Sequence, residues 1–556
     1  MHHSKPIVRS MLIAAWLLAA GGVHAAPTAP AAPPRLVVVL VVDGLPNEQL
    51  MRYRDQFGQG GFRRLLDQGA AFGNAHQAHG ITVTAVGHAA ILTGAYPYQH
   101  GVVGNNWIDP KTHASVYCTE DPAFSYIGEK TKPSDGTSPA NLRVDTLGDQ
   151  LRYASGNRAK VVTVSGKDRG AILLAGKTGT AYMYMDDSGN FASSTYYMQS
   201  HPDWVQRYQS ARPQDRYYGK TWTPLLADSA YATDADDSFY PVTAGTANRF
   251  PFTFSSKSGA IDADYFKKLK TGPYLDELTL DFARAAVEGE GLGANAAGVT
   301  DLLGVSLSAH DYVNHAFGPE SKMSHDHLQR LDRMLAGFFD YLDRRVGRDS
   351  FLVVLTADHG FANAPEFSKA RHIDAGRIPS AKLVAALNAH LQEKYRLAPL
   401  VRASSMPNIH LDRELLAAHG LSQDEVERTA ARFLMTQVGV ADVVTRGQME
   451  TGAAQATRTR VLMRRAWNAE RSGDLMVVTR PYWVFGSGSS GSSHGTPYAY
   501  DTSVPLVVMG PRWIKGGYYG QYAETVDLAP TLAALLRVRP PAGSEGKVLT
   551  EILHAK

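Results

Sequence analysis

Aspartate and histidine residues recur in this sequence at spacings that could bind a divalent metal ion. Asp311 and His315 stand four residues apart, which places both side chains on one face of a helix. Asp358 and His359 are adjacent in the chain. Carboxylate oxygens and imidazole nitrogens are ligands that zinc accepts, although an Asp/His pair on a helix also fits an ordinary ion pair. The remaining candidate ligands are Asp43 and His494.

A candidate nucleophile precedes an apolar helical run. The segment 80–88 reads GITVTAVGH, and the apolar residues 89–92 follow it. Either Thr82 or Thr84 could be the N-cap of this helix. Alternatively, Thr84 is a nucleophile, because the positive potential at a helix N-terminus favours an anionic group. A threonine hydroxyl needs a base or a metal to lose its proton, so this hypothesis depends on the metal site.

Four short apolar runs end just before charged candidate residues. Unbroken runs of this length are typical of strands buried on both faces of a mainly parallel sheet, and helical patterns such as 327–346 alternate with them. We therefore expect an α/β fold with helices flanking a central, mainly parallel sheet, and with the charged residues beyond its carboxyl edge. The runs are 36–42 before Asp43, 161–164 before Lys167, 302–307 before Asp311, and 352–356 before Asp358.

Two long regions interrupt this alternation. Residues from about 171 to 275 are rich in tyrosine and tryptophan, and residues from about 365 to 485 carry helical and strand patterns of their own, including a helix over 380–395. Insertions of this kind often form caps over an active site. We predict one catalytic domain over 35–556 with these two insertions, followed after the second by a Gly/Ser-rich loop over 486–493.

Composition excludes several classes of function. The chain has 556 residues, 44% of them apolar and 20% charged, as expected for a folded protein rather than a disordered one. A net charge of +3 gives no reason to expect nucleic acid as the main partner, and no nucleic-acid-binding module is evident. A single cysteine, Cys118, excludes an intramolecular disulfide and a multi-cysteine metal site.

The N-terminus is typical of a secretory signal peptide. Lys5 and Arg9 form a positively charged N-terminal region, and the apolar run 11–20 follows it. This run is short for a membrane span, and no later segment is apolar and long enough to cross a bilayer. We therefore predict a cleaved signal peptide over 1–25, an Ala/Pro-rich tether over 26–34, and a periplasmic or secreted protein without a membrane span.

The order of the motifs resembles that of the alkaline phosphatase superfamily over nearly all of the predicted mature chain. The match is closest to the branch with a threonine nucleophile, which is shared with nucleotide pyrophosphatases/phosphodiesterases. Within that branch the sequence looks like the phosphate-irrepressible alkaline phosphatases, which are monoesterases. The motifs are Asp43 after a strand, Thr84-Ala-Val-Gly-His88, His100-Gly-Val-Val-Gly-Asn105-Asn-Trp107, Ser165-Gly-Lys167-Asp-Arg169, Asp311-x-x-x-His315, Thr356-Ala-Asp358-His359-Gly360 and His494-Gly495.

The resemblance implies two zinc ions and a phosphothreonine intermediate on Thr84. Two cations can stabilise the attacking and the leaving oxygens of an in-line displacement. Asn105 resembles the amide that donates a hydrogen bond to a phosphoryl oxygen; otherwise it is a turn residue. The implied ligands are Asp311, His315 and His494 for one ion, and Asp43, Asp358, His359 and the Thr84 oxygen for the other.

Lys167 and Arg169 favour phosphate monoesters as substrates. A monoester carries more terminal negative charge than a diester, so two cations near its oxygens would select for it. Alternating lysine and arginine are often solvated loop charges, but these two follow a strand that is expected to end near the metals. We therefore predict an exported, zinc-dependent alkaline phosphatase that hydrolyses small phosphate monoesters.

Three other functions fit parts of the sequence. A phosphodiesterase or nucleotide pyrophosphatase on the same scaffold would need room for a second substituent, and Lys167 and Arg169 argue against it. A sulfatase would need a nucleophile in a C/S-x-P-x-R setting, which the sequence around Cys118 lacks. An inactive binding protein would have lost a ligand or the nucleophile, whereas every position that we can match is occupied.

Overall fold

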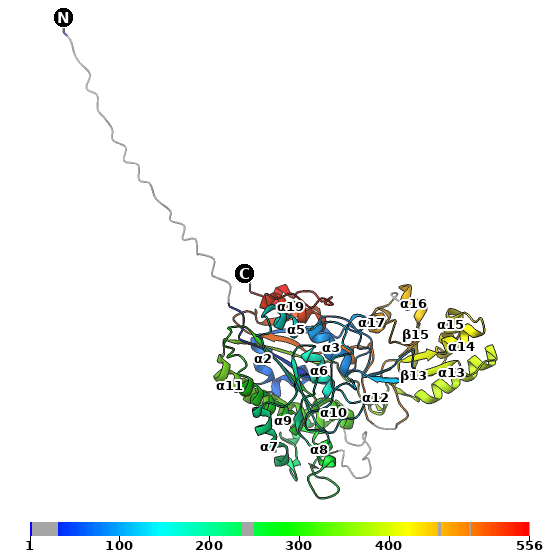
Figure 1. The fold of residues 1–556 in the computed structure, drawn as a ribbon, viewed down its shortest axis with the longest axis horizontal. Coiled ribbons are helices and arrows are strands. Elements are labelled where there is room, and N and C mark those ends of the chain that lie inside the picture. Colours follow the sequence, from blue (N-terminus) through cyan, green and yellow to red (C-terminus); the bar gives the residue numbers. More distant parts are fainter. Residues whose placement is uncertain (3–31, 236–248, 454–456, 489–490, 555–556) are drawn as a thin grey trace. The chain divides into compact units, whose positions relative to one another are not determined.

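A nine-stranded sheet lies at the centre of the computed structural model, which describes residues 1–2, 32–235, 249–453, 457–488 and 491–554 (Figure 1). Its strands are, in order, β19 (Gly517–Glu524), β2 (Ala70–His76), β18 (Leu506–Met509), β11 (Phe351–Thr356), β1 (Leu36–Val42), β10 (Asp301–Leu307), β5 (Val161–Ser165), β6 (Thr180–Tyr184) and β7 (Phe191–Ala192). Pairing is parallel from β11 through β1, β10 and β5 to β6, and antiparallel where β18 and β7 join. The predicted α/β fold with a mainly parallel sheet is confirmed.

Helices cover both faces of this sheet, which explains why its central strands are buried at every position and mostly apolar. On β6, Tyr182 and Tyr184 share a core with α9 (Pro273–Glu290) and α11 (Lys322–Leu342). Ala181 and Met183, on the opposite face of the same strand, pack against α6 (Asp168–Ala175). All seven residues of β1 are buried. A strand covered on both faces has no polar alternation, as the sequence pattern predicted.

The N-terminal predictions fall mostly outside the described residues. The signal peptide predicted over 1–25 and the tether predicted over 26–34 include residues 3–31, which the structure does not describe. All elements discussed below belong to one compact unit, residues 33–555. Among the helices of the described ranges, none has both the length and the apolar character that a membrane span requires.

The first insertion starts later than the sequence pattern indicated. We placed its start at about residue 171, but this position lies inside α6, and both β6 and β7 are strands of the central sheet. The tyrosines of β6 belong to a buried strand and not to an aromatic loop. The segment outside the sheet therefore begins after β7. Its elements include α7 (Asp203–Ser210), β8 (Thr221–Trp222), β9 (Phe252–Thr253) and α8 (Ala263–Leu269).

The region 365–485 contains a sheet and a core of its own. Four strands pair in the order β13 (Val401–Ser405), β14 (Asn408–Leu411), β16 (Leu475–Thr479) and β15 (Val440–Thr445). Helices α13 (Ser380–Tyr395) and α15 (Gln423–Leu434) contact each other beside this sheet (Figure 1). A second apolar cluster joins the inserted sheet to the chain around the candidate nucleophile. Its members include Ile81, Val83, Val86, Met463, Met476 and Val478.

Candidate active site

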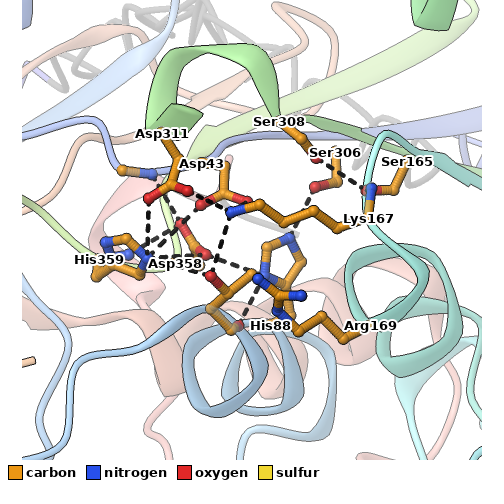
Figure 2. A network of polar contacts seen from close by, with 12 residues as sticks. Asp43, His88, Ser165, Lys167, Arg169, Ser306, Ser308, Asp311, Asp358 and His359 are labelled. Carbon is orange, nitrogen blue, oxygen red and sulfur yellow. Dashed lines mark hydrogen bonds and ion pairs between the residues drawn. The ribbon is translucent and has the colours of Figure 1, made fainter. Parts of the chain in front are cut away.

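The carboxyl ends of adjacent parallel strands bring the predicted acids together. Asp43 follows β1 directly, and Asp358 and His359 follow β11. Asp311 lies in α10 (Ala309–Phe317), the helix that follows β10. Lys167 stands between β5 and α6, and its side chain reaches into the centre of this group (Figure 2). The site lies beyond the carboxyl edge of the sheet, where ligands bind in open α/β folds.

Thr84 is the first residue of α3 (Thr84–Thr93) and is buried. The N-cap of this helix is Val83, which excludes the alternative that Thr82 or Thr84 is the cap. The Thr84 hydroxyl oxygen lies 3.5 Å from Nε2 of His359 and 3.4 Å from Nζ of Lys167. Gly87 allows α3 to pack this closely against the chain after β11, because a Cβ atom at position 87 would lie 1.9 Å from the carbonyl oxygen of Asp358.

Two overlapping groups of side chains could each hold a metal ion. In each group the three ligand atoms all lie within 4.8 Å of one another. His359 belongs to both groups, an arrangement that the sequence did not predict. The groups are Asp43, Asp358 and His359, and Asp311, His359 and His494.

The donor atoms fit metal ions in chemistry and in spacing. Among the buried side-chain atoms of the described residues, Oδ1 of Asp43 and Oδ1 of Asp311 have no hydrogen-bond partner. Oδ1 of Asp311 lies 3.4 Å from Nε2 of His315 and 3.5 Å from Nε2 of His494. Two ligand atoms of one tetrahedral zinc ion lie about 3.3 Å apart, given bonds of about 2.0 Å. Buried carboxylate oxygens without donors are costly, so this arrangement suits bound cations.

The Nε2 atom points into the site in each of three histidines, His315, His359 and His494. Their Nδ1 atoms face backbone carbonyl oxygens, which only accept, so Nδ1 carries the proton and Nε2 keeps its lone pair. Burial lowers the pKa of His315 and of His494, which favours the neutral imidazole that binds metals. The Nδ1–carbonyl distances are 2.9 Å from His315 to Ser492, 2.8 Å from His359 to Gly360, and 2.8 Å from His494 to Thr82.

Lys167 is a buried cation at the centre of the site, not a solvated loop charge. Only 3% of it is exposed. Its Nζ lies 2.7 Å from Oδ2 of Asp43 and 2.5 Å from Oδ2 of Asp311. Burial opposes the charged ammonium, but the carboxylates of Asp311 and Asp43 outweigh it and raise the pKa of Lys167. The ammonium therefore stays charged next to Thr84.

Arg169 and Asn105 border the site from α6 and from the chain before β3 (Asn106–Ile108). Arg169 donates to the hydroxyl of Tyr117 at 3.2 Å. The Oδ1 atom of Asn105 accepts from the backbone N–H of Ala85 at 2.9 Å, which ties it to the N-terminus of α3.

Two supporting residues were missing from the sequence prediction. His88 places Nδ1 at 2.8 Å from the Thr84 carbonyl and 3.2 Å from Oδ2 of Asp358. Its position four residues after Thr84, on the same helix face, could have indicated this role. Asp501 accepts from the backbone N–H groups of Gly495 and Thr496 at 3.0 and 2.8 Å, and thereby holds the turn after His494. No spacing in the sequence indicated Asp501.

Asp501→Ala is expected to weaken metal binding about 10–100-fold, because residues that hold a ligand loop typically contribute this much. Burial raises the pKa of Asp501 to about 7, so a neutral side chain is tolerated at this position. Asp501→Asn, which keeps an acceptor oxygen, should retain most of the affinity. Titration of the metal-free protein with Zn²⁺ measures both variants. Unchanged affinity in Asp501→Ala would exclude this positioning role.

A match to a family model identifies the protein family of this chain. Residues 37–500 match the model of the type I phosphodiesterase / nucleotide pyrophosphatase family. The chain belongs to this family. Alkaline phosphatase PafA of Elizabethkingia meningoseptica is 34% identical over 558 residues, which cover 99% of each chain. A protein of Myroides odoratus named calcium-transporting ATPase is 35% identical over 531 residues, 94% of this chain and 95% of that protein.

The solved structure of wild-type PafA has the same fold. It superimposes with a TM-score of 0.86 at 34% identity and covers 94% of this chain and 100% of its own. A fourfold variant of PafA has also been solved, with a TM-score of 0.85. Its substituted threonine, asparagine, lysine and arginine have the same spacing along the chain as Thr84, Asn105, Lys167 and Arg169. The predicted superfamily and the predicted enzyme class, alkaline phosphatase, are confirmed by these matches.

Proposed function

We propose that this enzyme is an exported, zinc-dependent phosphomonoesterase that forms a phosphothreonine on Thr84. One observation carries the proposal: the Thr84 hydroxyl lies at a helix N-terminus within 3.5 Å of both a buried ammonium and the imidazole that the two candidate metal groups share. Export to the periplasm or the medium rests on the pattern of residues 1–25.

The ligand sets implied by the resemblance agree with the chemistry of the donors. When bound, two zinc ions supply Lewis-acid stabilisation of the attacking and leaving oxygens. His359 borders both sets, because its Nε2 lies 3.5 Å from Oδ1 of Asp43 and 3.9 Å from Oδ1 of Asp311. The proposed ligands are Asp43, Asp358, His359 and Thr84 for one ion, and Asp311, His315 and His494 for the other.

The Thr84 hydroxyl loses its proton to water and its oxygen attacks phosphorus, and the departing ester oxygen takes up a proton from water. A bond forms between Oγ1 of Thr84 and phosphorus while the bond from phosphorus to the ester oxygen breaks and the alcohol leaves. The N-terminal potential of α3 favours the negative charge on the transferred group. Water then hydrolyses the phosphothreonine and releases inorganic phosphate. Asn105 donates to a non-bridging oxygen through its amide nitrogen.

Lys167 and Arg169 supply the preference for monoesters. A charged ammonium 3.4 Å from the Thr84 hydroxyl is close enough to stabilise the terminal oxygens of a phosphoryl group bound at Thr84. A diester carries an uncharged substituent on one of these oxygens, so the cation stabilises it less. The alternative function is a phosphodiesterase or nucleotide pyrophosphatase on the same scaffold, in keeping with the name of the family model.

Removal of the metals tests the proposal. Exhaustive chelation should abolish hydrolysis of an aryl phosphate monoester, and Zn²⁺ should restore it, with two ions bound per chain. His494→Ala should lower the zinc content, because removing one ligand of a site typically costs much of its affinity. Elemental analysis and activity are measured on the same samples. Full activity in protein without detectable metal would exclude the mechanism.

A further inference from the structure

A cavity of about 340 Å³ lies between the inserted sheet and the chain that carries Thr84. Its volume is within the range of about 300–1,000 Å³ that is usual for small-molecule pockets. Asn105 and His494 line both this cavity and the candidate active site. The cavity therefore opens onto the site from the side of the ligand His494.

The lining of this cavity mixes apolar and uncharged polar side chains and is almost without charge. Of the described residues that line it, only His494 is ionisable. Val83, next to the nucleophile, forms one wall, and β16 and β17 (Trp483–Phe485) of the inserted region form another. Trp483 is fixed in place, since its Nε1 donates to Asp374 at 3.2 Å. These walls offer an uncharged organic group apolar and aromatic contacts, and they hold no lysine or arginine for a phosphate.

A second cavity on the other side of the site has the opposite character. Its volume is about 820 Å³, and Lys167 and Arg169 lie in its wall. Other charged groups line it, among them Lys270, which pairs with Asp186 at 2.6 Å. Carboxylates and cations both line this cavity, and its end beside Lys167 and Arg169 suits the terminal oxygens of a phosphoryl group. The uncharged cavity is then left for the organic part of the ester.

We propose that the cavity between the inserted sheet and α3 binds an uncharged aromatic leaving group. This inference rests on the proposed function, because it assigns the leaving alcohol of the ester that Thr84 attacks. Aromatic side chains and a thioether give an aryl ring close contacts without a polar partner. The inserted sheet thus contributes to substrate specificity. The side chains that would touch the ring are Val83, Met406, Val478, Trp483 and Phe485.

Two variants of Phe485 test the assignment through a ratio of rates. Phe485→Ala should lower kcat/KM for 2-naphthyl phosphate relative to methyl phosphate about tenfold, as expected when a hydrophobic pocket loses part of its contact. Phe485→Glu should lower this ratio further and should favour the cationic tyramine phosphate over phenyl phosphate. A merely structural role of Phe485 would not produce that change of preference. Met406→Ala repeats the test on another wall of the cavity.

Phe433→Ala is the matched control. Phe433 lies on α15 of the same inserted region, stacks on His390 with ring centroids 4.5 Å apart, and does not line the cavity. The ratio in this variant should equal that of the wild type. An unchanged ratio in all cavity variants would overturn the pocket assignment while phosphatase activity remained. Absence of any monoester hydrolysis in the zinc-loaded wild type would instead overturn the proposed function, and the pocket with it.

Discussion

Thr84→Ala is expected to lower kcat for an aryl phosphate monoester by about 10⁴-fold or more, because removal of a nucleophile leaves only the catalysis that the rest of the site supplies. The hydroxyl points at His359 and Lys167 and not into the apolar core, so its loss should leave the fold intact. Mass spectrometry of wild-type enzyme quenched in acid during turnover should find the phosphate on Thr84.

Two controls separate the role of the hydroxyl from that of the helix. Thr84→Ser keeps a hydroxyl at the same place and should retain part of the activity. Thr93→Ala removes another buried threonine hydroxyl from the far end of α3, where it donates to the carbonyl of Ala89 at 2.6 Å, and should remain active. Phosphate trapped on a different residue would contradict the assignment of Thr84.

The double variant Lys167→Ala/Arg169→Ala is expected to lose about 10²–10³-fold in kcat/KM on a phosphate monoester, as preorganised charges typically contribute this much. A matched aryl diester should lose far less, since it carries less charge on its terminal oxygens. The measurement compares the two substrates in the wild type and in the variant, both loaded with zinc.

The double variant Lys132→Ala/Lys267→Ala is the matched control. It also removes two positive charges from the wall of the charged cavity that Lys167 and Arg169 line. Lys267 lies 3.7 Å from Asp187, away from the nucleophile, so this control should leave the ratio of monoester to diester hydrolysis as in the wild type. Zinc content must be measured in parallel, because Lys167 contacts two of the proposed ligands. Equal losses on both substrates at unchanged zinc content would favour the phosphodiesterase alternative.

The sequence by itself determined four central strands of the sheet, β1, β5, β10 and β11, and the candidate ligands. A strand covered by helices on both faces is typically a near-continuous apolar run, so the run before Asp43 predicts β1 at its observed bounds. The chain turns polar where the strand ends, and the carboxyl ends of parallel strands meet at one edge. The spacing of Asp311 and His315 predicts a shared helix face, and both lie in α10. These are local patterns, and local patterns can be seen in a sequence.

Only the tertiary structure decided which groups touch. Asp501 holds the turn after His494, and His359 belongs to two ligand groups. Lys167 is buried against Asp43 and Asp311. Each of these contacts joins side chains from separate strands and loops. The tyrosine-rich β6 was assigned to the first insertion because its aromatic residues resemble those of the loop that follows it. Burial and contact between distant segments arise when the sheet assembles, and no spacing along the chain records them.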